Sequence, residues 1–405
     1  MNSEGPLADV KMLDFAWVMA GPAGTRMLAD YGARIVRVES PTRIDTARTL
    51  QPHQNDRFGA DSSGLFGNCN AGKLGIAIDI GNPRAREVIL DLVRWADVVT
   101  ESFSPKAMRK WALDYASLRN IRPDIIMLST CLFGQTGPLR QIAGFGNMAA
   151  AIAGFSNLAG WPDRTATGVF GAYTDYIAPR YTAIAILAAL EHRRRTGEGQ
   201  YIDQAQAESA IHFLAPAILE YSANRRDPQR AGNTDRDVAP HGVYPAAGVD
   251  RWVAIVCRTD SEWRALCDAM AAPALGDDSR FITMRARIDN HTTLDAIIGA
   301  WTASRSAVEI EQLLQACGVP AYQVQNSAEA WRDTQLKHRG HFVEIEHPTI
   351  GRTTIEGPRS HLSRTPGRVR QAAPSLGRDN QYVLEKILGY DQDRISDLVV
   401  AGVFG

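Results

Sequence analysis

The segment Leu13–Gly24 reads L-D-F-A-W-V-M-A-G-P-A-G, an apolar run followed by a turn of small residues. A helical pattern comes next, and after it a second apolar run that ends at Glu39. Strand, small-residue turn, helix and second strand, in that order, are typical of a dinucleotide-binding unit. In such units the small residues let a ligand approach the turn, and an acid ends the second strand. The segment therefore indicates an α/β fold.

The turn itself departs from the phosphate-binding pattern. Its order is A-G-P-A-G and not G-x-G-x-x-G, and Pro22 lacks the backbone N–H that a phosphate-binding loop donates. Three interpretations stay open on these residues: tight packing of the helix on the sheet, a nucleotide-type ligand, and an NAD site. An NAD-dependent oxidoreductase is accordingly our alternative from another functional class.

The rest of the N-terminal half alternates apolar runs with helical patterns, which predicts a parallel sheet covered by helices. The expected elements are strands at Val10–Phe15, Arg34–Glu39, Asp97–Thr100 and Ile125–Thr130, and helices at Ala23–Gly32, Arg84–Trp95, Ile177–Arg195 and Gln200–Ile211. The helix that ends at Arg195 closes with four basic residues before Thr196 and Gly197, the charge and glycine order of a helix C-terminus.

The length of 405 residues suits two to three lobes of roughly 100–200 residues each. A polar, turn-rich stretch at Asn224–Thr234 marks a boundary. We predict a large domain over residues 1–224, a small domain over 225–330 and a C-terminal segment over 331–405. The expected elements beyond the boundary are strands at Arg251–Cys257, His341–Glu346 and Arg352–Glu356, and helices at Asp260–Met270, Leu294–Trp301, Ala307–Cys317 and Tyr382–Leu388.

Composition limits the partners and the compartment. The 44 Lys and Arg residues nearly balance the 45 Asp and Glu residues, so neither nucleic acid nor an anionic membrane is an expected partner. Met1–Asp9 have no basic start followed by an apolar core, and no later window resembles a membrane span. Five cysteines without a C-x-x-C pair fit a reducing cytoplasm. His338 and His341 lie near one another without companion ligands, so we expect no metal.

Asp175 lies in the segment Gly171–Tyr176, directly before the predicted long helix, with Pro179 in its expected first turn. An acidic residue there is by default an N-cap whose oxygen accepts from unpaired backbone N–H groups. The position also suits a nucleophile, because the positive helix end keeps a carboxylate ionised and nearby N–H groups can support oxyanions. The residues alone leave both roles open.

Lys106, Arg109 and Lys110 follow a predicted strand, at the edge where a parallel sheet presents its ligands. Cations clustered at the start of a helix are repelled by the positive end of the helix dipole, and a bound anion would offset this repulsion. A solvated basic face is the other interpretation. Lys73 and Arg37 are weaker candidates of the same kind.

Taken together, these segments resemble the class III CoA-transferases, over nearly the whole chain. Seven segments carry the resemblance, in order: L-D-F-x-x-V-x-A-G-P-A from Leu13, the strand G-A-x-I-V-R-V-E, N-A-G-K-L with Ile78-Asp79 after it, A-D-V-V-T-E-S-F-S-P, the turn Gly134–Pro138, the Asp175 segment, and R-R-R-T-G-E-G-Q. One such segment is modest evidence, whereas seven at family spacing are highly specific.

The resemblance implies an interlocked homodimer, whose two chains thread through each other like linked rings. It implies a Rossmann-like large domain completed by the C-terminal segment, with a smaller α+β domain in between. It also implies that Asp175 is the nucleophile, which carries coenzyme A as an aspartyl-CoA thioester, and that no cofactor beyond CoA is needed. Whether a homologous second subunit is required stays open.

Several family positions imply contacts with coenzyme A. With the cationic and aromatic candidates, the expected CoA-binding set is Val18, Met19, Arg37, Ser40, Ile78, Ser102, Phe103, Lys106, Lys110 and Phe145. Lys110 stands where an arginine is frequent, so it would neutralise a phosphate as a point charge and not as a bidentate fork.

Departures from the family pattern limit the substrates and the type of reaction that we expect. The stretch Val238–Tyr244 stands where formyl-CoA transferase has a glycine-rich flap, which makes an oxalate-type substrate doubtful, and Gly146 stands where that enzyme has a glutamate. Related acyl-CoA racemases have a histidine near Phe145, and phenylalanine cannot move a proton, so a transferase is preferred over a racemase. The phrases around Asp175 and His241 look most like the benzylsuccinate branch, which implies succinyl-CoA as donor and a hydrophobic or aromatic carboxylic acid as acceptor. His241 is either a substrate contact or a hydrogen-bonded loop residue.

Overall fold

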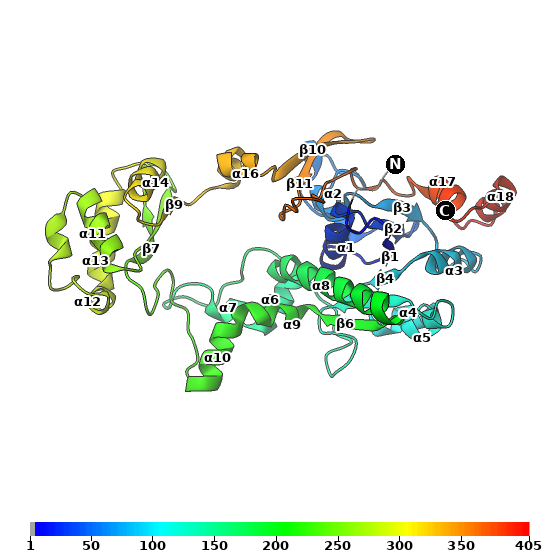
Figure 1. Ribbon diagram of the computed structural model, residues 1–405, viewed down its shortest axis with the longest axis horizontal. Coiled ribbons are helices and arrows are strands. Elements are labelled where there is room, and N and C mark those ends of the chain that lie inside the picture. The colour runs from blue at the N-terminus through cyan, green and yellow to red at the C-terminus, as the bar shows by residue number, and fades with distance from the viewer. Residues whose placement is uncertain (1–4, 405) are drawn as a thin grey trace. The chain divides into compact units, whose positions relative to one another are not determined.

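The computed structural model describes residues 5–404 and divides into two compact units, coloured by residue number in Figure 1. The large unit comprises Met1–Asn157, Gly168–Pro228 and Gln335–Gly405, and the small unit comprises Leu158–Thr167 and Gln229–Thr334. The predicted boundaries after residues 224 and 330 lie close to these. Residues 158–167, which we expected in the large domain, belong to the small unit.

A six-stranded parallel sheet forms the centre of the large unit, which confirms the α/β class. Its strand order is β3-β2-β1-β4-β5-β6. The strands are β1 (Lys11–Phe15), β2 (Arg34–Glu39), β3 (Leu74–Ala77), β4 (Val98–Glu101), β5 (Ile126–Cys131) and β6 (Tyr201–Ala205). The order reverses between β1 and β4, so the loops that follow these two strands diverge and open a crevice at the carboxyl ends of the strands.

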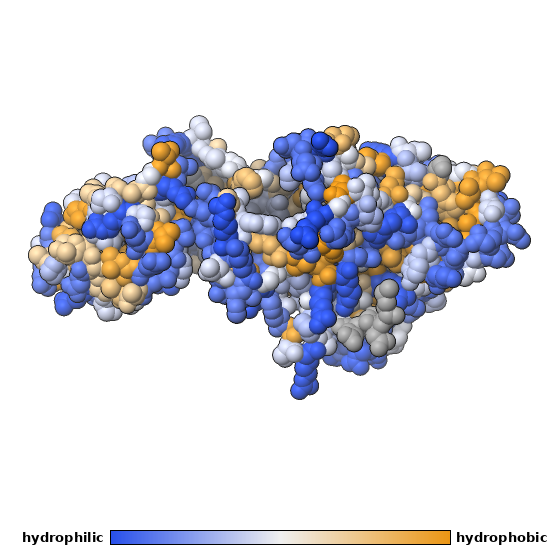
Figure 2. Space-filling view, turned by 90° about the horizontal axis from the view of Figure 1, so that it is seen from above, coloured by the Kyte–Doolittle hydropathy of each residue, from blue (hydrophilic) through white to orange (hydrophobic). Residues whose placement is uncertain are grey.

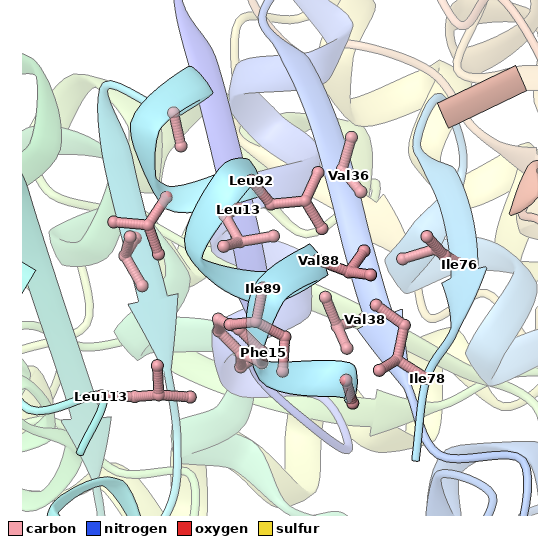
Figure 3. Close-up of a cluster of buried hydrophobic side chains, with 14 of the residues drawn as sticks. Leu13, Phe15, Val36, Val38, Ile76, Ile78, Val88, Ile89, Leu92 and Leu113 are labelled. Carbon is pink, nitrogen blue, oxygen red and sulfur yellow. The ribbon is translucent and has the colours of Figure 1, made fainter. Parts of the chain in front are cut away.

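Successive side chains of a strand point to opposite faces of the sheet, and here both sets are largely apolar. Helices therefore cover both faces of the sheet. On one face α3 (Ala85–Trp95) packs on β1, β2 and β3 through Val88, Ile89 and Leu92 (Figure 3). On the other face lie α1 (Ala20–Asp30) and the 24-residue α8 (Tyr173–Thr196), which contact each other. A Cβ at position 24 would lie 2.6 Å from Thr182 Cγ2, so the small residues of the first turn serve close helix packing.

Shorter helices complete the part of the large unit before the boundary. They are η1 (Thr46–Thr49), η2 (Gln54–Asp56), α2 (Gly64–Asn70), α4 (Pro105–Lys110), α5 (Tyr115–Arg119), α6 (Gly146–Ala153), α7 (Phe155–Leu158), α9 (Gln206–Ile211), η3 (His212–Leu214) and α10 (Ala215–Asn224). The predicted helix at Gln200–Ile211 is wrong in its first half, which forms β6. Pairing of β6 with β5 supplies its backbone with hydrogen-bond partners and overrides the weak local pattern.

The C-terminal segment returns to the large unit. It contains α16 (Thr334–His338), the antiparallel pair β10 (Phe342–His347) and β11 (Gly351–Glu356), α17 (Asn380–Tyr382), the π-helical turn η5 (Val383–Ile387) and α18 (Gln392–Val400). Asp379 Oδ2 accepts from the backbone N–H of Gly75 at 2.7 Å, and Asn380 Oδ1 accepts from that of Ala77 at 2.9 Å. These side chains satisfy donors on the open edge of β3, which would otherwise be free to pair with another strand.

The small unit is an α+β domain with its own core. Its antiparallel sheet has the order β7-β8-β9, formed by β7 (His241–Pro245), β8 (Trp252–Val256) and β9 (Ala321–Gln323). Its helices are α11 (Asp260–Ala269), η4 (Pro273–Gly276), α12 (Met284–Asp289), α13 (His291–Thr302), α14 (Ala307–Ala316) and α15 (Ser327–Arg332). Capping boxes at Thr259 and Ser306 begin α11 and α14, each closed by a glutamate three residues later.

The surface of the chain is mixed in character. On the face shown in Figure 2, apolar residues lie among hydrophilic ones. Among residues 5–404, no helix is both long enough and apolar enough to cross a membrane. The same described residues contain no group of three or more His, Cys, Asp or Glu side chains positioned to hold a metal ion.

Candidate active site

A cavity of about 820 Å³ opens at the carboxyl ends of the sheet strands, and all of its lining residues belong to the large unit. Its walls come from the loops that follow β1, β2, β3, β4 and β5 and from the segment before α6. The predicted residues that line it are Val18, Met19, Ser40, Ser102, Phe103, Lys110, Phe145 and Asp175. The switch point of the sheet therefore brings most of the predicted set together.

Asp175 is the third residue of α8, not its N-cap. The helix begins at Tyr173, its cap residue Ala172 makes no side-chain bond, and the Asp175 N–H donates to Ala172 O at 2.9 Å. The capping interpretation is therefore wrong, and Pro179 lies inside the helix, beyond its first turn. The Asp175 side chain is 7% exposed. Burial raises the pKa of Asp175 to about 6, and a hydrogen bond from Gln206 opposes that rise.

A small hydrogen-bond network holds the Asp175 carboxylate. The Gln206 Nε2 group donates to Asp175 Oδ1 and, at 2.8 Å, to Thr174 Oγ1. The Thr174 hydroxyl donates in turn to Gly146 O at 2.8 Å. Gln206 was not predicted from the sequence, because a glutamine in a polar stretch between strand and helix carries no motif signal.

Gly146 lies directly against the nucleophile candidate. A Cβ at this position would lie 2.6 Å from Asp175 Oδ1 and 2.9 Å from Thr174 Oγ1. Both distances are shorter than van der Waals contact permits, so any side chain here would displace the carboxylate. Asp175 can therefore hold its position only because residue 146 is glycine, where formyl-CoA transferase has a glutamate.

The loop after β1 is held in a strained conformation. Val18 has φ of 64°, which is unfavourable for a β-branched residue. Its N–H donates to Asp45 Oδ1 at 3.0 Å, and the N–H of Trp17 donates to Ser102 Oγ at 2.8 Å. Arg37 supports this loop from within the core, because its guanidinium donates to Ala16 O at 2.7 Å and pairs with Asp45. Arg37 does not line the cavity.

Ile78 and Lys106 also lie outside the cavity lining. Ile78 is fully buried in the core beside α3 (Figure 3), and its N–H donates to Glu39 O at 2.8 Å. Its neighbours Asp79–Gly81 line the cavity instead. Lys106 is exposed on α4, whereas Lys110 at the end of the same helix faces the cavity. The two lysines are one helical turn apart, and only Lys110, at the end nearer the cavity, lines it.

Two arginines that the sequence analysis missed add positive charge to the wall. Arg43 lies over the Trp17 ring, 5.8 Å from its centroid, and Arg140 donates to Gly137 O at 3.1 Å. Both lie in loops, where exposed arginines are too common to carry a signal. With Lys110 they give the cavity three cations, which suits an anionic ligand.

Other candidate residues have structural partners. Lys73 is fully buried and donates to Asp14 Oδ2 at 2.9 Å, so it binds no ligand from solvent. Glu39 accepts hydrogen bonds from both Nε and Nη2 of Arg48. Its carboxylate is therefore already paired, whereas an NAD site would need it to bind a ribose. His241 lies in the small unit with Nδ1 2.8 Å from Asn233 O. Its contact with substrate stays a prediction.

Comparison with known proteins identifies the family. The family model for CoA-transferase family III matches residues 7–380. The chain belongs to this family. As a member of CoA-transferase family III it is an enzyme, a class III CoA-transferase, as the sequence predicted. The family assignment leaves the NAD-dependent oxidoreductase without support, and the relatives described next are named as transferases and not as racemases.

Relatives of this family III protein match it over nearly their whole length. Succinyl-CoA--D-citramalate CoA-transferase of Chloroflexus aurantiacus is 32% identical over 393 residues, covering 97% of this chain and 96% of that protein. The β subunit of succinyl-CoA--L-malate CoA-transferase from the same organism is 32% identical over 400 residues, with the same coverage of 97% and 96%. A crystal structure of a CaiB/BaiF family protein from Brucella suis superposes with a TM-score of 0.86 at 31% identity, covering 95% of this chain and 100% of that one.

Proposed function

We propose that this transferase moves coenzyme A from succinyl-CoA to a carboxylic acid through an aspartyl-CoA thioester on Asp175. The observation that carries the proposal is a buried carboxylate at the cavity wall, with Oδ1 held by Gln206 and with no donor to Oδ2 among the described residues. Such a carboxylate is oriented on one oxygen and free to attack through the other. Both relatives described above are named for succinyl-CoA, which supports this donor.

The proposed reaction conserves the energy of the thioester at each step. Asp175 Oδ2 attacks the succinyl-CoA carbonyl, which forms a mixed anhydride and releases CoA thiolate. The thiolate attacks the Asp175 carbonyl carbon, which releases succinate and leaves the aspartyl-CoA thioester. The acceptor carboxylate then attacks this thioester, and the returning thiolate cleaves the new anhydride to give acceptor-CoA and free Asp175. These steps need no metal or redox group, so we propose that CoA thioesters are the only cofactor-like molecules required.

We propose that CoA lies along the wall formed by the loops after β1, β2 and β4. Lys110, Arg43 and Arg140 would neutralise its phosphates, and Trp17 and Phe103, whose rings meet edge-on with centroids 5.9 Å apart, offer an apolar surface to the adenine. Val18, Met19, Ser40, Ser102 and Phe145 complete the proposed contacts. Arg37, Ile78 and Lys106 are left out, because their side chains do not line the cavity.

Two classes of acceptor acid have support. Leu132, Ile142 and Phe145 contribute apolar side chains to the cavity wall, which favours the hydrophobic or aromatic acid expected from the sequence. The relatives are named for citramalate and malate, which favours a dicarboxylic acid. A donor and acceptor panel that contains both classes distinguishes them by the acyl-CoA formed.

We propose that the functional form is the interlocked homodimer. Exposed apolar side chains on α8 and α10 support an assembly, since such side chains gather where a partner covers them: Ile184 and Leu187 on α8, and Ile218 and Leu219 on α10. One relative is named as the β subunit of its enzyme, so a homologous second chain is the alternative assembly. The cytoplasmic location stays a prediction.

Intact-protein mass spectrometry tests the proposed function. Wild-type protein and Asp175→Ala are mixed with succinyl-CoA, with and without hydroxylamine, which cleaves aspartyl thioesters and anhydrides. We expect a hydroxylamine-sensitive adduct in the wild type alone. An adduct that persists in Asp175→Ala, or its absence from the wild type with every donor of an acyl-CoA panel, would contradict the proposal.

A further inference from the structure

The side chain that contacts the reacting carboxylate is a neutral amide. Gln206 is the first residue of α9, directly after β6, and it is 6% exposed. Its Nε2 group reaches Asp175 Oδ1 and Thr174 Oγ1 across about thirty residues of sequence. Gln206 also lines the cavity in which we propose that the thioester reacts.

The Thr174 hydroxyl determines which end of the Gln206 amide faces Asp175. A hydroxyl has one proton, and Thr174 donates its proton to Gly146 O at 2.8 Å. Thr174 can therefore only accept from Gln206, which turns the NH2 group and not the carbonyl toward both partners. One of the two amide protons is committed to Thr174, and the other points at Asp175 Oδ1.

We propose that Gln206 is a further catalytic residue, an oxyanion donor to the acyl group carried by Asp175 itself. This inference rests on the proposed function. When Oδ2 forms the anhydride, Oδ1 becomes its carbonyl oxygen. The CoA thiolate then adds to Asp175 Cγ, and the π electron pair moves onto Oδ1. Collapse of this tetrahedral intermediate expels the donor carboxylate and returns the double bond to Oδ1.

The Gln206 N–H donates to Oδ1 in every one of these states. The developing negative charge strengthens this hydrogen bond in the transition state, which is how an oxyanion donor accelerates acyl transfer. The same geometry recurs when the acceptor carboxylate adds to the thioester. Loss of one such donor lowers the rate of acyl transfer by about 10²–10³-fold.

Gln206→Met tests the donor, because methionine is unbranched, of similar length and unable to donate. Rapid-quench mass spectrometry follows formation of the hydroxylamine-sensitive adduct, and equilibrium titration gives the affinity for CoA. We expect adduct formation to slow by about 10²-fold or more with CoA affinity unchanged. Gln204→Met is the matched control. Gln204 is buried two residues upstream, donates to Ala178 O at 2.9 Å and accepts from Thr182 at 2.7 Å, without contact to Asp175, so it should react at close to the wild-type rate.

Gln206→Glu gives a test that does not depend on the methionine variant folding. A glutamic acid beside Asp175 shares one proton with it over an intermediate pH range, and the protonated partner can donate to Asp175. The variant should therefore lose activity as pH rises and the shared proton leaves, whereas wild type gains activity as Asp175 ionises. Wild-type adduct formation in Gln206→Met, or a wild-type pH profile in Gln206→Glu, overturns the role of Gln206 alone. Absence of any adduct in the wild type overturns the proposed function as well.

Discussion

Burial of the Asp175 carboxyl sets the pH range in which it can react. Only the ionised form is a nucleophile, and burial raises the pKa of this carboxyl to about 6. Because a raised pKa keeps the group protonated at mildly acidic pH, the rate of adduct formation should fall about tenfold per pH unit below about pH 6 and reach a plateau above it. Stopped reactions over pH 4.5–8, with CoA binding measured in parallel, check this. A rate that begins to fall only near the ordinary pKa of an aspartate would contradict this prediction.

Gly146→Ala tests how closely the carboxylate is placed. The added Cβ would lie 2.6 Å from Asp175 Oδ1, so the carboxylate must move by several tenths of an ångström or more. We expect the rate of acyl transfer to fall by about 10²-fold with the thermal midpoint little changed, because small displacements of reacting groups are costly. Gly67→Ala is the control, since a Cβ there meets nothing within 4 Å. Equal activities of the two variants would contradict the prediction.

Single residues were predictable from sequence only where a motif or an element boundary marks them. Asp175 and the loop residues Val18, Ser40 and Ser102 were predicted through the family segments that contain them, and all four line the cavity. Their roles stay proposals. Gln206 did not, because its role comes from a contact between two side chains that the fold brings together. Arg37 has the charge expected of a ligand contact, yet its partner is the internal Asp45. Charge and position along a strand do not reveal which direction a side chain points.

At the scale of elements, one buried lysine joins three of them. Lys73 lies just before β3 and donates to Asp14 Oδ2 in β1, to Pro22 O in α1 and to Asn70 Oδ1 in α2, at 2.9–3.0 Å. Removing one partner of a buried ion pair leaves the other charge unpaired, which typically costs about 3–5 kcal/mol. We therefore expect Lys73→Met to lower the free energy of unfolding by about that amount, measured by urea denaturation. The exposed Lys11 provides the control, and a Lys73 variant as stable as Lys11→Met would contradict the expectation.

Elements with strong local patterns were predicted well, and elements defined by pairing were not. The strands β1, β2, β4 and β5 and the helices α3 and α8 correspond to the predicted ranges within a few residues. β3 is four residues long and was not predicted, and β6 was predicted as helix. Both lie at edges of the sheet, where neighbouring strands supply the hydrogen bonds that the short sequences do not specify.

At the scale of the whole molecule, the proposed interlocked dimer makes a prediction about exchange. Linked chains cannot separate without unfolding, so two differently tagged preparations should form no mixed dimers when incubated together in native buffer. Mixed dimers should appear after the preparations are unfolded and refolded together, as native mass spectrometry would detect. Mixed dimers that form within hours in native buffer would contradict interlocking, and a monomeric mass would contradict the dimer itself.

The contacts that Asp379 and Asn380 make with β3 also bear on how the protein is made. During synthesis, β1 to β6 leave the ribosome well before the segment from residue 335 onward. Until that segment arrives, the N–H groups of Gly75 and Ala77 lack these partners, and the open strand can pair with other nascent chains. The large unit is thus completed only after nearly all of the chain has been translated. A holdase that shields the growing polypeptide would be most useful during that interval.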